Sequence, residues 1–179
     1  DVKWAIAGRD SRKLNELNQK ITGSDVDQIP ELIADSHDET SLRQLLSSTK
    51  VVCSTVGPYA IYGSLLVQLC LEEGTHYCDL TGEVHWMRQM MEIHQVAAET
   101  SGARIVHNCG FDSIPSDLGT LYIQNEMNRL HGVYAPRVKY RVVSSKGGIS
   151  GGTVASMFNM MEEAKTNPEI LEIMADPYS

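Results

Sequence analysis

Basic residues are scarce in this sequence. The chain of 179 residues has 15 Lys and Arg against 23 Asp and Glu, which leaves a formal net charge of −8. A protein that binds nucleic acids in general needs a basic face to neutralise phosphates, and no basic tract is visible, so we expect no nucleic-acid partner. No apolar stretch approaches the roughly 18 residues of a transmembrane helix, and no secretory signal pattern opens the sequence.

Cysteine is also scarce, with four residues, Cys53, Cys70, Cys78 and Cys109. They form no C-x-x-C pair and have no histidine at a zinc-like spacing, and the six histidines are scattered through different segments. We therefore expect no metal site. Each cysteine lies in an apolar run, which predicts buried reduced thiols and a cytoplasmic protein, while a peripheral contact with a membrane stays compatible.

A glycine-rich phosphate-binding turn is missing too. No Gly-x-Gly-x-x-Gly occurs anywhere, because residue 149 in the run from Gly147 to Gly152 is isoleucine. In dinucleotide-binding folds this turn follows the first strand and holds the pyrophosphate. If the chain has such a fold, that strand and its turn should precede residue 1.

Strand-sized apolar runs alternate with helix-sized periodic segments over most of the chain. This alternation is typical of β-α-β units around a parallel sheet. We predict strands at 4–7, 31–35, 51–56, 76–80 and 104–108, and helices at 11–21, 40–48, 64–73, 84–100 and from 115. The fold class is therefore α/β, a Rossmann-like doubly wound parallel sheet, in which the absent first strand would leave a gap between the second and the fourth.

The pattern changes near residue 134. Residues 138–143 alternate apolar and polar, which predicts a strand with one wet face, and a glycine-rich loop follows. The segment 154–165 is predicted as an amphipathic helix with Val154, Met157, Phe158 and Met161 on one side. We expect a nucleotide-binding domain at 1–133 and the beginning of a second, α+β domain at 134–179, through which a homodimer could form.

Ligands of open α/β sheets bind at the carboxyl ends of the strands. If residues 4–7 are the second strand, Arg9 stands where an arginine selects the 2′-phosphate of NADP and an acidic residue selects NAD. Arg12 and Lys13 follow closely, after Ser11 as the expected N-cap of the next helix. In the alternative reading, Arg9 merely caps a solvated loop. Asp35 ends the next predicted strand and is a further candidate on the cofactor side.

Two other strand ends carry groups that could move a proton. Asp79 and Glu83 are four residues apart across a turn, so both carboxylates could reach one cleft, unless one of them caps the following helix. Asp112, with Ser113, could line the cleft or cap its own helix. A short-chain dehydrogenase is disfavoured, because no tyrosine is followed by a lysine four residues later.

Four runs in fixed order resemble the saccharopine dehydrogenase-like oxidoreductases, a group that includes trans-acting enoyl reductases. The runs are WAIAGR at 4–9, STVGPYAIYG at 54–63, GTHYCDLTGE at 74–83 and GFDSIPSDLG at 110–119. The resemblance covers about residues 3–160 and implies an NADP-binding Rossmann domain.

The resemblance also implies roles for individual positions. Arg9 would read the 2′-phosphate, and the pyrophosphate and nicotinamide-ribose side would be lined by Thr55, Val56, Gly57, Pro58 and Tyr59. The residues near the nicotinamide would be Asp79, Thr81, Gly82 and Glu83, and those facing the substrate cleft would include Asp112, Ser150, Gly151 and Thr153. Our candidates for the catalytic acid or base are Tyr59, Asp79 and Glu83.

The function expected from these residues is hydride transfer between NADP, rather than NAD, and a small amine, imine, enoyl or acyl substrate. No residue has an unambiguous catalytic role in the sequence alone. The alternative is therefore a catalytically silent protein that senses a nucleotide or acts as a scaffold.

Overall fold

The computed structural model describes residues 2–23 and 29–176. The chain divides into two compact units. The first contains Asp1–Val52, Ala60–Tyr77 and Met90–Ile105, and the second contains Cys53–Tyr59, Cys78–Gln89 and Val106–Ser179. Each unit is described by itself below, and the domain boundary predicted at residue 134 stays a prediction.

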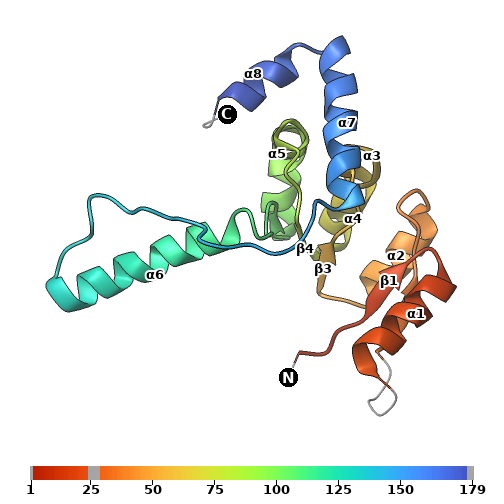
Figure 1. Ribbon diagram of the computed structural model, residues 1–179. Helices are drawn as coiled ribbons and strands as arrows, with labels where there is room; N and C mark the ends of the chain where they lie inside the picture. Colours follow the sequence, from red (N-terminus) through yellow and green to blue (C-terminus); the bar gives the residue numbers. More distant parts are fainter. Residues whose placement is uncertain (1, 24–28, 177–179) are drawn as a thin grey trace. The chain divides into compact units, whose positions relative to one another are not determined.

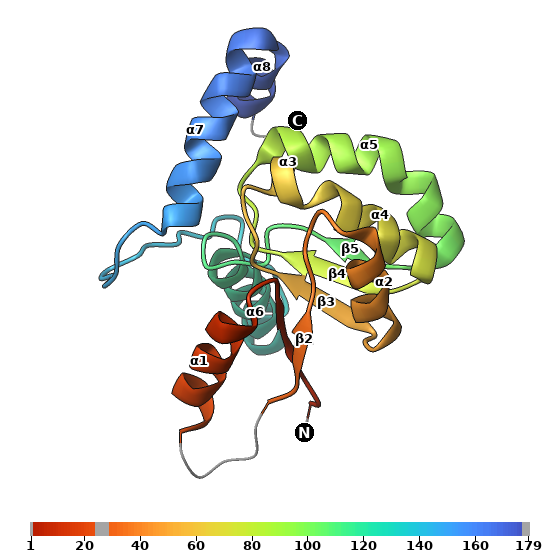
Figure 2. The same cartoon turned by 90° about the vertical axis from the view of Figure 1, so that its right-hand side faces the viewer.

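In the first unit, two short parallel strands lie beside a capped helix. Strand β1 (Ile6–Gly8) pairs in parallel with β2 (Glu31–Ile33) (Figure 2). Helix α1 (Ser11–Thr22) packs on both. The expected N-cap Ser11 is wrong: Asp10 caps α1, because its carboxylate accepts from the backbone N–H groups of Arg12 and Lys13.

Two further helices of this unit bury an apolar core. Helix α2 (Glu39–Ser47) and helix α4 (Ser64–Glu73) pack against each other. The residues buried on them are Leu42, Leu46, Leu66, Val67, Leu69, Cys70 and Leu71. Because α4 buries several successive side chains, it is apolar around most of its surface rather than along one stripe.

Three more strands form a second sheet, whose order is β3-β4-β5 (Figure 2). They are β3 (Val51–Ser54), β4 (His76–Asp79) and β5 (Ile105–Val106), and helix α5 (Val84–Ser101) connects the last two. All five predicted strands are present, each followed by a helix, so the α/β prediction is confirmed. The separation of β1-β2 from β3-β4-β5 agrees with the strand order of a Rossmann fold, in which another strand stands between these two groups.

The prediction of buried thiols holds for one cysteine. Cys70 is completely buried, and this burial raises the pKa of its thiol to about 12. Cys53 is exposed, and Cys78 and Cys109 are half-buried, so the prediction is wrong for these three. All four are free thiols. Apolar neighbours in the sequence did not ensure burial, because Cys53 occupies an alternate position of β3 that points away from the packed side.

The second unit contains three helices and a long extended segment. Helix α6 (Ile114–His131) is followed by residues 133–150, which contain no helix or strand and lead to α7 (Gly151–Thr166) and α8 (Glu169–Ala175) (Figure 1). The strand predicted at 138–143 is therefore absent, because a strand requires a paired neighbour and none lies beside it in the described chain.

The helix predicted at 154–165 is present as part of α7, and its apolar side is exposed. On α7, the side chains of Val154, Met157, Phe158 and Met161 are 41–66% exposed. Its polar residues make the contacts instead, as described below. Across the described residues, no helix combines the length and apolar character that crossing a bilayer requires.

Candidate functional site

Asp79 is the most deeply buried charged residue of the second unit, at 0% exposure. It ends β4. Its Oδ1 atom accepts hydrogen bonds from the backbone N–H groups of Thr81 (3.1 Å) and Asn108 (3.0 Å), and its Oδ2 atom lies 2.7 Å from Nδ1 of His107. These bonds connect the turn after β4 with the end of β5. The Asp79 carboxylate thus holds two neighbouring strand ends together and does not cap α5.

His107 completes this pair and was not predicted as a site residue. Its side chain is 10% exposed, and its ring meets Trp86 edge-on with centroids 5.0 Å apart. When the carboxylate is ionised and the imidazole neutral, Nδ1 must carry the proton that faces Asp79. The next residue, Asn108, has a φ of 62°, in the left-handed region that a non-glycine residue seldom occupies. His107 could have been found from its position near the end of the strand that follows, along the chain, the strand that contains Asp79.

Glu83 immediately precedes α5 and is 2% exposed. Its Oε1 atom accepts from the backbone N–H of Tyr59 at 2.8 Å and from the hydroxyl of Ser156 at 2.7 Å. Glu83 therefore joins the loop after β3 to helix α7, whereas Asp79 binds residues near β5. The two carboxylates bind different partners, although they are only four residues apart.

The loop after β3 contains a cis peptide bond between Gly57 and Pro58. Thr55 and Val56 are exposed at its start, and Pro58 and Tyr59 are buried. A Cβ atom on Gly57 would lie 3.4 Å from the Tyr59 ring, at van der Waals contact, so the ring packs directly on this part of the loop. The resemblance assigned this loop to the cofactor.

Tyr59 begins the short helix α3 (Tyr59–Tyr62). Its hydroxyl donates to the carbonyl of Ser54 (3.1 Å) and accepts from the N–H of Leu80 (3.3 Å). Burial, with the nearby charge of Asp79 as a smaller contribution, raises the pKa of this phenol to about 12. Tyr59 is thus a neutral phenol that connects the carboxyl ends of β3 and β4, and this geometry favours a positioning role over proton transfer.

Arg9 and Asp35 lie in the first unit, after β1 and β2 respectively. Arg9 is exposed, and Asp35 is half-buried with its Oδ1 atom accepting from the N–H of His37 at 3.0 Å. That hydrogen bond is the main cause of the lowered pKa of Asp35, and the charge of Arg9 lowers it further. The structure thus brings Arg9 close enough to Asp35 for their charges to interact.

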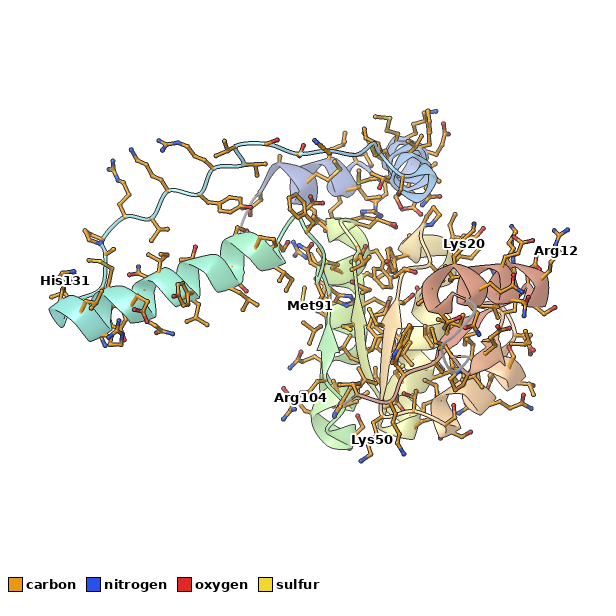
Figure 3. All side chains as sticks on the ribbon, turned by 60° about the horizontal axis from the view of Figure 1, so that its bottom comes forward. Arg12, Lys20, Lys50, Met91, Arg104 and His131 are labelled. Carbon is orange, nitrogen blue, oxygen red and sulfur yellow. The ribbon has the colours of Figure 1, made fainter. Side chains whose placement is uncertain are left out.

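The first turn of α1 adds to the positive charge after β1. It contains Arg12 and Lys13 and no acidic residue. Lys20 is at the other end of this helix, as Figure 3 shows for Arg12 and Lys20. Basic residues at a helix N-terminus oppose the helix dipole, which favours anions there. The Asp10 carboxylate caps this terminus and offsets part of that repulsion. The cationic side chains of Arg12 and Lys13 still fit an anionic group such as the 2′-phosphate of NADP.

The residues predicted to face the substrate cleft lie at or just before the first turns of α6 and α7. Asp112 is exposed in the turn before α6, and Ser113 stands at the N-cap position without a side-chain capping bond. Ser150 caps α7 by accepting from the N–H of Thr153, and Gly151 is the first residue of that helix. The α7 residue that reaches the buried Glu83 carboxylate is Ser156, which no pattern in the sequence singled out.

The structure shows no cluster of metal-binding side chains in the described ranges, 2–23 and 29–176. No three His, Cys, Asp or Glu side chains gather there in an arrangement that could hold an ion. The buried carboxylates Asp79 and Glu83 are instead bound to backbone N–H groups and to the side chains of His107 and Ser156.

Comparison with known proteins supports the predicted family. The profile of the saccharopine dehydrogenase NADP binding domain matches residues 1–106. The chain is 37% identical over 178 residues to a Mycobacterium tuberculosis protein assigned as a trans-acting enoyl reductase, covering 99% of the chain and 42% of that protein. It is 36% identical over 180 residues to the trans-acting enoyl reductase of Mycobacterium leprae, covering 99% and 43%.

The fold is also similar to a solved structure. The apo saccharopine dehydrogenase (L-Glu forming) of Saccharomyces cerevisiae aligns with a TM-score of 0.55 at 17% identity, over 72% of this chain and 26% of that one. This likeness confirms the Rossmann-like fold. The chain spans less than half the length of the curated relatives it matches. The profile match agrees with the prediction of NADP, and the chain belongs to the saccharopine dehydrogenase NADP-binding domain family.

Proposed function

We propose that this chain is the NADP-binding part of an oxidoreductase that transfers a hydride between NADPH and a small substrate. Of the substrate classes expected from the sequence, the enoyl class occurs in the names of similar proteins, which include trans-acting enoyl reductases beside a saccharopine dehydrogenase. Enoyl reduction has the stronger support, because the relatives named for it are 36–37% identical and the saccharopine dehydrogenase is 17% identical.

The observation that carries the proposal is the basic corner after β1. Arg9, Arg12 and Lys13 gather at the carboxyl end of a strand in a chain whose net charge is −8. A guanidinium pairs with phosphate oxygens through two parallel hydrogen bonds. These residues would hold the 2′-phosphate, and the corner would distinguish NADPH from NADH.

The resemblance assigns the nicotinamide side of the cofactor to the loop after β3 and to the turn from Asp79 to Glu83. When bound, NADPH supplies the hydride, and the protein supplies orientation and electrostatics. The loop from Gly57 to Tyr59 would lie along the cofactor, with the Tyr59 hydroxyl fixing its position. Asp79 and His107 form the polar pair best suited to hold a proton, because the aspartate lies 2.7 Å from Nδ1 of the imidazole and fixes the orientation of its ring.

The substitution Arg9→Ala tests the role of the basic corner. A hydrogen bond to a charged group contributes about 1.5–3 kcal/mol, so we expect NADPH to bind about 10- to 100-fold more weakly. NADH has no 2′-phosphate, and its affinity should change less than twofold. Isothermal titration calorimetry or the enhancement of NADPH fluorescence measures both affinities.

Lys20→Ala is the matched control, since it removes a positive charge from the opposite end of α1. It should leave both affinities unchanged. Equal losses of NADPH and NADH affinity in Arg9→Ala would refute the 2′-phosphate role. An absence of saturable NADPH binding by the unaltered protein would refute the function itself.

A further inference from the structure

Helix α7 contacts the rest of its unit through a polar stripe. Ser156, Asn159 and Glu163 are three and four residues apart, so they share one face of the helix. Glu163 accepts from the Asn159 amide at 2.9 Å and lies 2.9 Å from Nε2 of His85, a buried residue in the first turn of α5. Ser156 reaches Glu83, which immediately precedes α5. Polar contacts thus place α7 against the beginning of α5.

Ser156 lies beside the cis-proline loop as well as beside Glu83. A Cβ atom on Gly57 would be 3.5 Å from the Ser156 hydroxyl. The same Glu83 oxygen, Oε1, accepts from Ser156 and from the backbone N–H of Tyr59. Because Glu83 is only 2% exposed, its carboxylate depends on such donors for stability. One buried oxygen therefore connects α7 to the loop.

We propose that Ser156 is a positioning residue for the nicotinamide side of the site. It acts through Glu83, whose carboxylate then sets the orientation of the Gly57–Pro58–Tyr59 loop. The inference rests on the proposed function, since that function assigns this loop to the cofactor. It adds to the site a residue outside the part of the chain that the family profile matches, and it makes Glu83 a positioning residue rather than an acid or base.

Two ligands that differ in one part test this proposal. NADPH contains the complete pyrophosphate, the second ribose and the nicotinamide, whereas adenosine 2′,5′-bisphosphate has the same adenosine and 2′-phosphate without them. In the full-length protein, Ser156→Ala should weaken NADPH binding about tenfold, because it removes a donor to a charged acceptor. Binding of adenosine 2′,5′-bisphosphate should change less than twofold. Calorimetry measures both affinities.

Two further variants separate this role from a general loss of structure. Ser156→Thr keeps the hydroxyl and should restore NADPH binding, and Ser145→Ala, in the exposed segment before α7, should have no effect. Equal weakening of both ligands by Ser156→Ala, or no weakening of either, overturns the proposal.

Hydrogen exchange without any ligand distinguishes failure of this inference from failure of the proposed function. Ser156→Ala should speed exchange several-fold in a peptide that contains the Tyr59 amide and leave α1 unchanged. If the unaltered protein binds neither nucleotide, the proposed function is refuted, while the exchange still decides whether Ser156 positions the loop. Unchanged exchange at Tyr59 overturns the positioning role.

Discussion

Tyr59 illustrates at the scale of one residue how the surroundings select among the roles that a side chain could play. A tyrosine beside a glycine-proline turn was a reasonable catalytic candidate. In the structure its hydroxyl donates a hydrogen bond to the carbonyl of Ser54 and accepts one from the N–H of Leu80. The raised pKa of about 12 follows mainly from burial and keeps the phenol protonated at neutral pH.

This pKa predicts a loss of stability at alkaline pH. The pKa of tyrosine is about 10 in the unfolded chain and about 12 in the folded protein. The folded state therefore favours the protonated phenol, and this contribution to stability is fully present below pH 10. It should be lost as the pH rises to 12, by roughly 2–3 kcal/mol.

The variant Tyr59→Phe isolates that contribution. We expect urea unfolding to show it less stable than the unaltered protein at pH 9, because Ser54 and Leu80 lose their partner. The difference in the free energy of unfolding should shrink between pH 10 and 12. A difference that stays constant over this range would contradict the burial of a neutral phenol.

Helices α2 and α4 show, at the scale of elements, how an apolar contact is supplemented by charge. Their packed faces contain Leu42 and Leu69, which are 3% and 0% exposed. At the margin, Arg43 of α2 binds Glu39 on its own helix and Glu72 and Glu73 on α4. Hydrogen bonds to Glu72 and then Glu39 raise the pKa of this arginine. The arginine thus links two helices whose cores are already in contact.

We predict that Arg43→Met lowers the free energy of unfolding by a small but measurable amount, since exposed ion pairs contribute little individually but three of them share this arginine. In 1 M NaCl the loss should be smaller, because salt screens exposed charges. Urea unfolding at both ionic strengths measures it. Arg129→Met removes a single pair with Glu126 within α6 and should cost clearly less. If the loss of stability is the same at both salt concentrations, the effect of Arg43 comes from packing rather than from charge.

At the scale of the whole molecule, the division into two units crosses the strands of one sheet. β3, β4 and β5 each contribute residues to both units. Hydrogen bonds along a shared sheet couple the segments that form it. We therefore expect the two units to unfold together despite their separate sets of contacts.

Tryptophan fluorescence can test this cooperativity. Trp4 belongs to the first unit and is 54% exposed, whereas Trp86 belongs to the second and is 1% exposed. In the variant Trp4→Phe, Trp86 alone reports on the second unit. Its urea transition should coincide with the transition in far-UV circular dichroism, which reports on all helices. Two separate midpoints would show that the units unfold independently.

Local patterns predicted most of the secondary structure but not the direction in which its side chains point. Helical periodicity correctly indicated a helix near 154–165, yet the residues that contact the protein are Ser156 and Glu163 rather than Met157 and Phe158. The alternation at 138–143 indicated a strand, and the structure has none there. Periodicity describes one segment, whereas packing and strand pairing depend on a second segment.

The sequence by itself determined the α/β alternation, the family, and Arg9 at the end of a strand, because each depends on residues close together in the chain. Only the tertiary structure decided what the two carboxylates bind. Asp79 meets His107 after 28 residues, and Glu83 meets Ser156 after 73. These contacts are hydrogen bonds between buried polar groups, which require exact placement of distant segments and leave no periodic trace in the sequence.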